Sequence, residues 1–436
     1  MRILISAGEA SGEMYGAQLI EALAKHFPDA HPVGARAEGA PALPADPERR
    51  GAARSRLEFF GAGGARMRAA GCDLVVDAEE LSVVGITEIL GHLPKIWGLY
   101  HKLIAEARRR RPDLAVVIDS PAFNWRVARE MKRRGVPVVY YVCPQFWAWR
   151  QGRVRYLRKY VDRALVIFPF EERFYRDRGV NAEFVGHPLA GLARPGISRD
   201  QYAREHGLSR DKRWITLMPG SRRKEVRMNL GEILDASERL GDQHEFLLPV
   251  APTLDRRFIE ELLHSRAGRR PRARREGEGG ARTPVAPGIR LVSDALPALA
   301  HSRAAIVASG TATVEAALME TPFVMVYRVT PATYLLGRWT VRVPHFAMVN
   351  LIAQEEVVPE LVQQDFTAER VVEEIKRILP DGAARKNMIE AFGKVKTLLG
   401  ASGGGSAPER AARAIYDFLG SRVPAGGPLA ESAPAG

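Results

Sequence analysis

The stretch IVASGTATVEAA, residues 306–317, joins the end of an apolar strand, a turn of small polar residues and the first turns of a helix. The turn has no lysine of the phosphate-loop kind, no nucleophile-elbow spacing and no pair of metal ligands. A looser copy of this pattern, RILISAGEASGEMYGAQLIEAL, occupies residues 2–23. The two copies raise the question of whether the chain has two ligand sites or two halves of one.

Short apolar runs alternate with helical patterns on both sides of these stretches. In the first half the runs are Ile3–Ser6, Leu114–Ile118, Val138–Val142 and Ala164–Ile167; in the second they are Ile215–Met218, Phe246–Val250, Ala304–Val307 and Phe323–Tyr327. This alternation predicts parallel sheets with right-handed crossovers, and continuous apolarity indicates that helices cover both sheet faces. The fold class is therefore α/β.

Proline and glycine interrupt the alternation at Gly186–Gly196 and mark a linker. We therefore expect two Rossmann-like domains, residues 1–188 and 189–419, followed by a loose tail at 420–436. Ligands of open parallel sheets bind outside the carboxyl ends of the strands. Two such edges facing each other across a cleft would share one site.

Composition limits the classes of partner. The chain has 436 residues and a net charge of +13, which indicates an anionic partner: nucleic acid, a phosphate-bearing substrate or an anionic membrane surface. No run approaches the roughly 18 apolar residues of a membrane span, and Ile3–Ile5 is too short for a signal peptide. Cys72 and Cys143 lack metal-ligand spacing, and we expect no disulfide and a cytoplasmic location.

Two low-complexity insertions, at about 34–55 and 265–288, contain none of the strand or helix patterns. The second has seven arginines against two glutamates and no aromatic residue. Binding of nucleic acid by stacking is disfavoured without aromatic residues, so a solvated loop is the preferred interpretation.

The turn at Ser309, Gly310 and Thr311 opens a helix whose first N–H groups lack intrahelical partners. Such an end binds phosphate or diphosphate, although an ordinary capped helix start has the same residues. Glu315 is not at capping-box distance and lies off the buried stripe of its helix. It is placed to accept hydrogen bonds from ribose hydroxyls.

The N-terminal turn GEASGE, with Gly8, Glu9, Ser11 and Gly12, allows a close approach of the backbone to a ligand. Its spacing does not match a hydrolase elbow, and a tight strand-to-helix turn is the alternative. A third glycine-rich stretch, GAGGAR at 61–66, fails the dinucleotide fingerprint, and no clear strand precedes it.

Asp119 stands directly at the end of the apolar run in PDLAVVIDSPAFNW. A carboxylate there would accept a proton from a hydroxyl, or it would cap the following helix; the sequence leaves both open. In LMPGSRRKEV, Arg222 would pair with a diphosphate. No D-x-D pair occurs to hold a metal, so the leaving-group charge falls to the arginine and the helix end.

The segment Leu81–Ile104 is apolar and contains Trp97 and Tyr100, with four arginines following at 108–111. A buried helix is one interpretation, but its glycines and proline make it a poor continuous helix. Aromatic and basic residues favour a membrane interface, as does the similar segment 143–160. We expect Val84, Ile89, Leu93 and Trp97 to contact membrane or acyl chains.

These residues together resemble the lipid-A-disaccharide synthase family of the two-Rossmann GT-B architecture. The matching stretches, in family order, are GEASGE, LSVVGITEIL, VIDSPAFN, FWAWRQGRV, FVGHPLA, PGSR, ASGTATVEAAL, VYRVTP and VNLIAQEEVVPELVQ. The chain departs from the family pattern at Glu13, where most members have Asp, and at Ala122, which replaces a usual acid.

The resemblance implies inverting transfer from UDP-2,3-diacylglucosamine to 2,3-diacylglucosamine 1-phosphate (lipid X), which yields a β-1,6 disaccharide phosphate and UDP. It implies that Asp119 is the base, that Arg222 and the Ser309 turn bind UDP, that Glu315 holds ribose and that Asn350 lines the same site. No cofactor is implied.

The resemblance also implies a peripheral location on the inner face of the inner membrane. A homodimer that exchanges C-terminal segments would use the helices within Thr367–Leu419.

Two other functions fit parts of this pattern. One is another UDP-sugar enzyme of the same architecture, such as a UDP-N-acetylglucosamine 2-epimerase, which would not need the apolar segment Leu81–Ile104 as an entrance for acyl chains. The other is a non-catalytic binder of acidic lipid or nucleic acid. That class explains the charge but not the set Asp119, Arg222 and Glu315.

Overall fold

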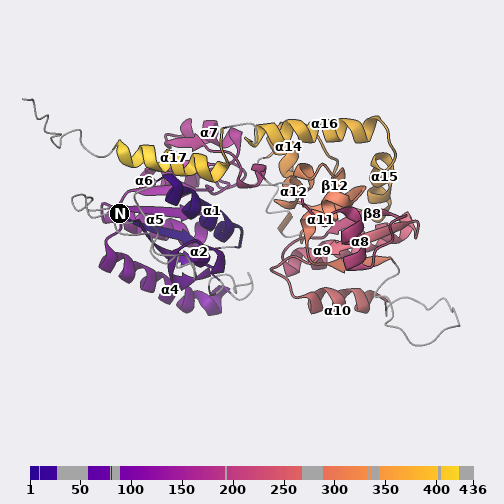
Figure 1. The fold of residues 1–436 in the computed structure, drawn as a ribbon, viewed down its shortest axis with the longest axis horizontal. Coiled ribbons are helices and arrows are strands. Elements are labelled where there is room, and N and C mark those ends of the chain that lie inside the picture. Colours follow the sequence, from indigo (N-terminus) through magenta and orange to yellow (C-terminus); the bar gives the residue numbers. More distant parts are fainter. Residues whose placement is uncertain are drawn as a thin grey trace, which may run out of the picture. The chain divides into compact units, whose positions relative to one another are not determined.

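A computed structural model describes residues 1–8, 10–26, 57–78, 80, 89–191, 194–267, 288–330, 333–334, 343–400 and 404–421. The chain divides into two compact units (Figure 1). The first comprises Met1–Phe146, Gln151–Pro188 and Gly403–Gly436, and the second Trp147–Arg150 and Leu189–Ser402. Both low-complexity insertions fall outside the described residues, apart from the short ends of the second.

The first unit is built on a parallel sheet of seven strands, in the order β3-β2-β1-β4-β5-β6-β7. The strands are β1 (Arg2–Ala7), β2 (Glu58–Gly63), β3 (Cys72–Asp77), β4 (Leu114–Ile118), β5 (Val138–Tyr141), β6 (Arg163–Val166) and β7 (Ala182–Phe184). The helices are α1 (Ala10–His26), α2 (Ala65–Ala69), α4 (Ile89–Arg110), α5 (Pro121–Arg133), α6 (Val154–Tyr160), α7 (Pro169–Arg176) and α17 (Ala407–Gly420).

The second unit has a parallel sheet of six strands, in the order β10-β9-β8-β11-β12-β13. The strands are β8 (Arg213–Met218), β9 (His244–Pro249), β10 (Ile289–Val292), β11 (Ala304–Ala308), β12 (Phe323–Tyr327) and β13 (Glu360–Val362). The helices are α8 (Arg199–His206), α9 (Arg223–Leu240), α10 (Arg256–Ala267), α11 (Ala295–His301), α12 (Ala312–Leu318), α14 (Met348–Ala353), α15 (Ala368–Ile378) and α16 (Ala383–Leu398).

Two doubly wound parallel sheets confirm the predicted α/β class with two Rossmann-like domains. In each sheet the strand order reverses once, between β1 and β4 in the first and between β8 and β11 in the second. Ligands of such sheets bind at this switch point, outside the carboxyl ends of the strands. The segments that follow these four strands are therefore where ligand-binding and catalytic residues are expected.

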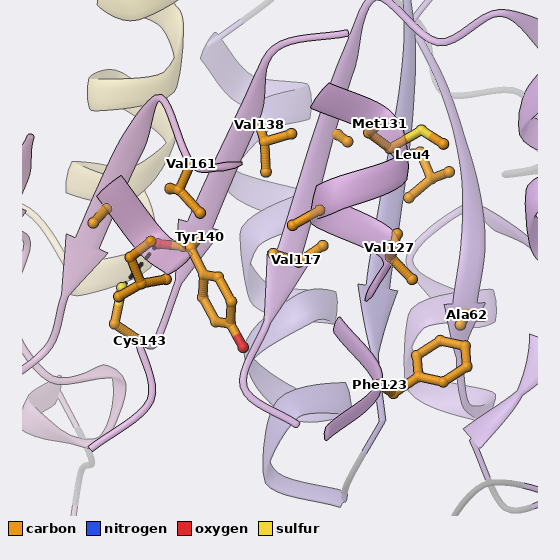
Figure 2. Packing of buried hydrophobic residues seen from close by; sticks show 14 of the residues in the cluster. Leu4, Ala62, Val117, Phe123, Val127, Met131, Val138, Tyr140, Cys143 and Val161 are labelled. Atoms are coloured by element: carbon orange, nitrogen blue, oxygen red, sulfur yellow. Dashed lines mark hydrogen bonds between the residues drawn. The ribbon is translucent and has the colours of Figure 1, made fainter. Parts of the chain in front are cut away.

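The core of the first unit forms because β4 is buried along its whole length and α5 has one apolar face. Phe123, Val127 and Met131 recur at every fourth position of α5, so they lie on one side of it and pack with Leu4 and Val117 (Figure 2). Full burial of each such side chain stabilises the fold by about 1.5–3 kcal/mol. This packing fixes the start of α5 against the end of β4.

Helix α17 belongs to the first unit, where it packs along α1 (Figure 1). The sequence had placed the chain up to residue 419 in the second domain, so this boundary differs. The physical reason is that α17 buries an apolar face in the first unit, with Ala411, Ala414 and Ile415 among its buried residues. In addition, Arg410 Nε donates a hydrogen bond to the carbonyl of Val185.

Two local expectations were wrong. A strand, β2, does precede the glycine-rich stretch 61–66 and ends within it at Gly63. Helix α4 is continuous through Pro94 and Gly98, whereas its composition had favoured a broken segment. Cys72 and Cys143 are both buried free thiols, as expected. Within the described ranges, no helix combines the length and apolarity needed to cross a membrane.

Candidate functional site

The turn after β1 lies directly against the turn after β4. A Cβ atom added at Gly8 would come within 2.4 Å of the Ser120 Oγ, and one at Gly12 within 3.8 Å of the Asp119 Cβ. The glycine at position 8 is thus required for this approach, because any side chain would displace Ser120. The structure brings the predicted N-terminal turn and Asp119 together at the switch point of the first sheet.

Buried Asn124, on the first turns of α5, ties these two turns together. Its Nδ2 donates to the main-chain oxygens of Ser6 (3.0 Å), Ile118 (2.8 Å) and Asp119 (2.9 Å). The Ser6 hydroxyl in turn donates to Asn124 Oδ1, at 2.6 Å. Asn124 belongs to the stretch VIDSPAFN, but the sequence alone indicated no role for it. The signal available was an amide residue four positions after the strand-end turn.

The backbone around Asp119 is strained. Asp119 and Ser120 have φ angles of 48° and 46°, a left-handed conformation that non-glycine residues adopt only when their surroundings hold them. The hydroxyl of Tyr140 donates to the Asp119 carbonyl at 2.8 Å, and the Asp119 N–H donates to the Tyr141 carbonyl at 3.2 Å. Burial raises the pKa of Tyr140 well above its ordinary value, so this hydroxyl stays a neutral donor.

Asp119 is half-buried, and it is not the helix cap that one interpretation of the sequence allowed. The N-cap of α5 is Ser120, and Pro121 occupies the first helical position. Ala122 is exposed and contributes no second carboxylate at this turn.

The second switch point carries the turn Ser309–Thr311 after β11. Two hydrogen bonds fix Ser309: its main-chain N–H donates to the Val326 carbonyl (3.0 Å), and its hydroxyl donates to the Phe346 carbonyl (2.8 Å). Gly310 has φ 141°, which only glycine adopts readily. Thr313 and Val314 N–H groups already bond to the carbonyls of Gly310 and Thr311. The donors left for a ligand are those of the turn itself rather than the whole first turn of the helix.

Glu315, one turn into α12, is half-buried, and burial raises its pKa to about 7. Within the part of the chain that the structure describes, no group donates a hydrogen bond to this carboxylate. A carboxyl group in this state readily accepts a hydrogen bond from a ligand hydroxyl, because ionisation becomes favourable once a donor is present.

The loop after β8 places Arg222 beside this turn, since β8 and β11 are paired neighbours. Glu225 Oε2 accepts the N–H groups of Ser221 and Arg222, and its Oε1 pairs with Arg222 Nη1 at 2.9 Å. From behind, buried Asn229 donates to the Pro219 carbonyl at 2.9 Å. Glu225 thus orients an exposed guanidinium at the same sheet edge as Ser309.

The sequence predicted that Asn350 lines the UDP site, but the structure places its side chain in the interior. It is fully buried, and its amide makes four hydrogen bonds: it donates to the Val358 carbonyl and to Glu360 Oε1, and it accepts from the N–H groups of Val357 and Val358. Its hydrogen-bonding capacity is thereby used inside the protein.

A chain of contacts links Asn350 to the Ser309 turn. The Glu360 carboxylate, which Asn350 orients, accepts the N–H groups of Phe346 and Ala347 at 2.8 and 2.9 Å. The Phe346 carbonyl is the group that receives the Ser309 hydroxyl. Asn350 is therefore connected to the turn through Glu360 and Phe346.

The remaining predicted residues are those expected to contact membrane or acyl chains, together with Glu9 of the N-terminal turn. Trp97, on α4, is 55% exposed and stacks on Tyr100 with ring centroids 5.4 Å apart. Val84 and Glu9 lie outside the described residues, as do the side chains of Ile89 and Leu93. On α5 and α6, Trp125 packs edge-on to Tyr156, and Arg126 and Arg155 lie over these rings.

No cluster of three or more His, Cys, Asp or Glu suited to a metal occurs among the residues that the structure describes. The chemistry available at the two switch points is thus a strained, half-buried carboxylate in the first unit. In the second it is a turn of main-chain donors, an arginine and a carboxyl group of raised pKa.

The chain is similar in sequence to one family along most of its length. The model of the family described as lipid-A-disaccharide synthetase matches residues 48–403. A lipid-A-disaccharide synthase from Koribacter versatilis is 47% identical over 95% of this chain and 98% of its own length. One from Acidobacterium capsulatum is 44% identical, with 96% of each chain covered.

Solved structures of two other kinds of enzyme share the fold at low identity. The calicheamicin glycosyltransferase CalG4 is 16% identical, with a TM-score of 0.55 over 97% of this chain and 99% of its own. A UDP-GlcNAc 2-epimerase from Methanocaldococcus jannaschii, in complex with UDP-GlcNAc and UDP, is 12% identical, with a TM-score of 0.55 over 96% of this chain and all of its own. Identities this low establish the architecture alone.

Proposed function

The chain belongs to the lipid-A-disaccharide synthase family, and from this premise we propose that it transfers a sugar from UDP-2,3-diacylglucosamine to the 6-hydroxyl of 2,3-diacylglucosamine 1-phosphate. The products are the β-1,6 disaccharide 1-phosphate and UDP. Family membership makes the protein a glycosyltransferase of lipid A biosynthesis. The observation that carries the finer proposal is Asp119, a carboxylate held in a strained conformation at a sheet switch point.

We assign the donor nucleotide to the second switch point. The turn Ser309–Thr311 offers main-chain N–H groups to the diphosphate, and Arg222 offers a guanidinium to the same charge. Glu315 accepts from the ribose hydroxyls. This division is supported by the pairing of β8 with β11, which puts Arg222 and Ser309 at neighbouring strand ends.

We assign the proton transfer to Asp119. The oxygen of the acceptor 6-hydroxyl attacks the anomeric carbon, its proton passes to the Asp119 carboxylate, and the bond from the anomeric carbon to the diphosphate breaks. UDP leaves with the electron pair, so a single displacement inverts the configuration. Arg222 and the Ser309 turn stabilise the charge that develops on UDP without a metal ion.

We propose that the acylated substrates are drawn from an anionic membrane surface at the inner face of the inner membrane. Exposed Trp97 on α4 and the aromatic–cation pairs of α5 and α6 have the composition of an interfacial surface. Val84, Ile89 and Leu93 would extend it.

We further propose a homodimer that exchanges C-terminal segments. In one chain α17 rests on α1, and this contact is the one that a partner's helix would replace.

The experiment is to incubate the purified protein with both acylated sugars in detergent micelles. The proposal predicts UDP and a disaccharide whose new anomeric linkage is β by proton NMR. A 2-epimerase would interconvert UDP-sugars and form no disaccharide, and a non-catalytic binder would release no UDP.

A further inference from the structure

A second basic feature lies in the second unit, away from the residues assigned to UDP. A pocket of about 350 Å³ is lined by six cationic side chains, those of Arg199, Arg210, Lys212, Arg213, Arg303 and Arg385. Asp211 is the only carboxylate among its lining residues. A concave site with this excess of positive charge selects for anions.

The pocket lies at the opposite edge of the sheet from Ser309 and Arg222. It gathers around Arg213, the first residue of β8, and Arg303, which directly precedes β11. The strands are parallel, so their amino ends share one edge and their carboxyl ends the other. The six residues of β8 separate these edges by roughly 17 Å. This pocket is therefore distinct from the proposed donor site.

The base of the pocket is rigid and positively charged. Arg199 lies over the ring of fully buried Trp214, at 4.0 Å from its centroid, and donates to the carbonyls of Arg210 and Lys212. Arg385 Nη1 donates to the carbonyl of Arg303 at 2.6 Å. These main-chain contacts fix the direction of two guanidinium groups, and carbonyl oxygens do not neutralise their charge.

Acidic partners are few around these cations. Arg303 pairs with Asp381 at 2.5 Å, but Asp381 is itself largely exposed. For the other five cations, the described parts of the chain supply no carboxylate within ion-pair distance. Burial lowers the pKa of Arg385, and the crowded like charges of Arg303 and Arg213 lower it further, against the opposing charge of Asp381. Such crowding is unfavourable unless an anion offsets it.

A helix end adds to this field. Arg385 stands in the first turn of the sixteen-residue helix α16, whose N-cap, Gly382, supplies no side-chain cap. The positive end of the helix dipole therefore lies beside the main chain of Arg385, one of the lining residues. Arginine forks match the oxygens of phosphate bidentately, and several of them together suit a multiply charged group.

We propose that this pocket binds a phosphate-bearing anion, either a free phosphorylated compound or the phosphate headgroup of a lipid. The binding groups are the guanidiniums of Arg199, Arg303 and Arg385 at the base and those of Arg210 and Arg213 at the exposed rim. The site goes beyond the proposed glycosyl transfer, because none of its lining residues takes part in that reaction.

The direct test is calorimetric titration of the full chain with inorganic pyrophosphate in the presence of saturating UDP, so that the donor site is occupied. We expect saturable binding that weakens at least about tenfold in the double variant Arg210→Gln/Arg213→Gln, since each lost charge-assisted hydrogen bond costs that much. Both side chains are exposed, so the variant should fold. The matched control, Arg204→Gln/Arg257→Gln, removes two exposed charges of the same unit outside the pocket and should bind as the unmodified chain does.

A second variant, Arg385→Lys, keeps the charge but removes the fork and should weaken pyrophosphate binding several-fold. Sedimentation with vesicles of phosphatidylethanolamine and phosphatidylglycerol separates the two sources. If the rim variant loses both pyrophosphate binding and sedimentation, the anion is a lipid headgroup. If it loses pyrophosphate binding alone, the anion is a free phosphorylated compound. Equal pyrophosphate affinity in the rim variant, the control and the unmodified chain would overturn the proposal, as would no binding beyond the UDP site.

Discussion

The side-chain nitrogen of Asn124 lies 2.9 Å from the main-chain oxygen of Asp119, and the same nitrogen donates to Ser6, next to the last residue of β1, and to Ile118 at the end of β4. One buried amide thus holds the strained carboxylate residue and joins the two strands that flank the switch point of the first sheet. The geometry of Asp119 therefore depends on this amide, which the first turn of α5 supplies.

Asn124→Ala should therefore lower both stability and rate. It removes the partner of the buried Ser6 hydroxyl, and a buried group left unsatisfied costs about 1–3 kcal/mol. We expect the free energy of unfolding in urea to fall by that amount, and disaccharide formation to fall roughly 10²-fold through misplacement of Asp119. A variant with unchanged rate would show that the amide is not needed for the chemistry.

Gly8→Ala should reduce turnover, whereas Gly12→Ala serves as its matched control. A Cβ at position 8 would lie 2.4 Å from the Ser120 Oγ and must push the turn that carries Asp119. At position 12 the nearest atoms are 3.6 Å away, which is ordinary contact. Initial rates in micelles should drop by roughly 10²-fold in the first variant only. Equal rates in the two variants would contradict the close packing of the two turns.

Arg222→Gln should weaken UDP binding by about 10–100-fold, because a charge-assisted hydrogen bond contributes about 1.5–3 kcal/mol. Its side chain is 69% exposed, so stability should hardly change. Lys224→Gln, two residues along and also exposed, is the control and should leave UDP affinity unchanged. Calorimetry gives both affinities.

A chelator tests whether Arg222 replaces a metal ion in neutralising the diphosphate. If it does, EDTA should leave turnover unaffected. Inhibition by EDTA that added metal restores would refute this.

Glu315 should make both stability and UDP affinity depend on pH. Its pKa is raised from 4.5 to about 7, so the folded state holds this proton more tightly than the unfolded chain. Its contribution to stability is therefore complete below about pH 4.5 and is lost as the pH rises through about 7. Urea unfolding of the unmodified chain and of Glu315→Gln should diverge across this window.

The affinity for UDP should depend on pH in the opposite direction from stability. Ribose hydroxyls donate best to the ionised carboxylate, so UDP affinity of the unmodified chain should rise between about pH 6 and 8. In Glu315→Gln the affinity should be lower and nearly independent of pH over the same range. A parallel pH dependence in both proteins would remove Glu315 from the nucleotide site.

Much of the fold could be predicted from the sequence, because both faces of each sheet are covered and the inner strands are continuously apolar. Edge strands such as β7, β10 and β13 are short and only partly buried, so their sequences carry too weak a pattern. The position of α17 could not be predicted, because it depends on contacts with α1, almost four hundred residues away.

The candidate site was predictable where a residue follows an apolar run directly, as Asp119 and Ser309 do. The location of Asn350 was not predictable, because an amide residue in a matching motif does not reveal whether its side chain faces a ligand or the interior. Asn124 and Glu360 went unassigned for the related reason that their function is to hold main-chain atoms. Which carbonyls a side chain will meet is decided by tertiary structure.

The role of Asp119 as the base is tested most directly by measuring disaccharide formation and UDP affinity together in Asp119→Asn. The substitution keeps the shape of the side chain and removes its ability to take a proton, and loss of a general base typically lowers rates by about 10²–10⁴-fold. We predict a fall of that size in turnover with UDP affinity nearly unchanged, because Arg222, the Ser309 turn and Glu315 belong to the other sheet. Turnover close to that of the unmodified chain would contradict the assignment of Asp119 as the base.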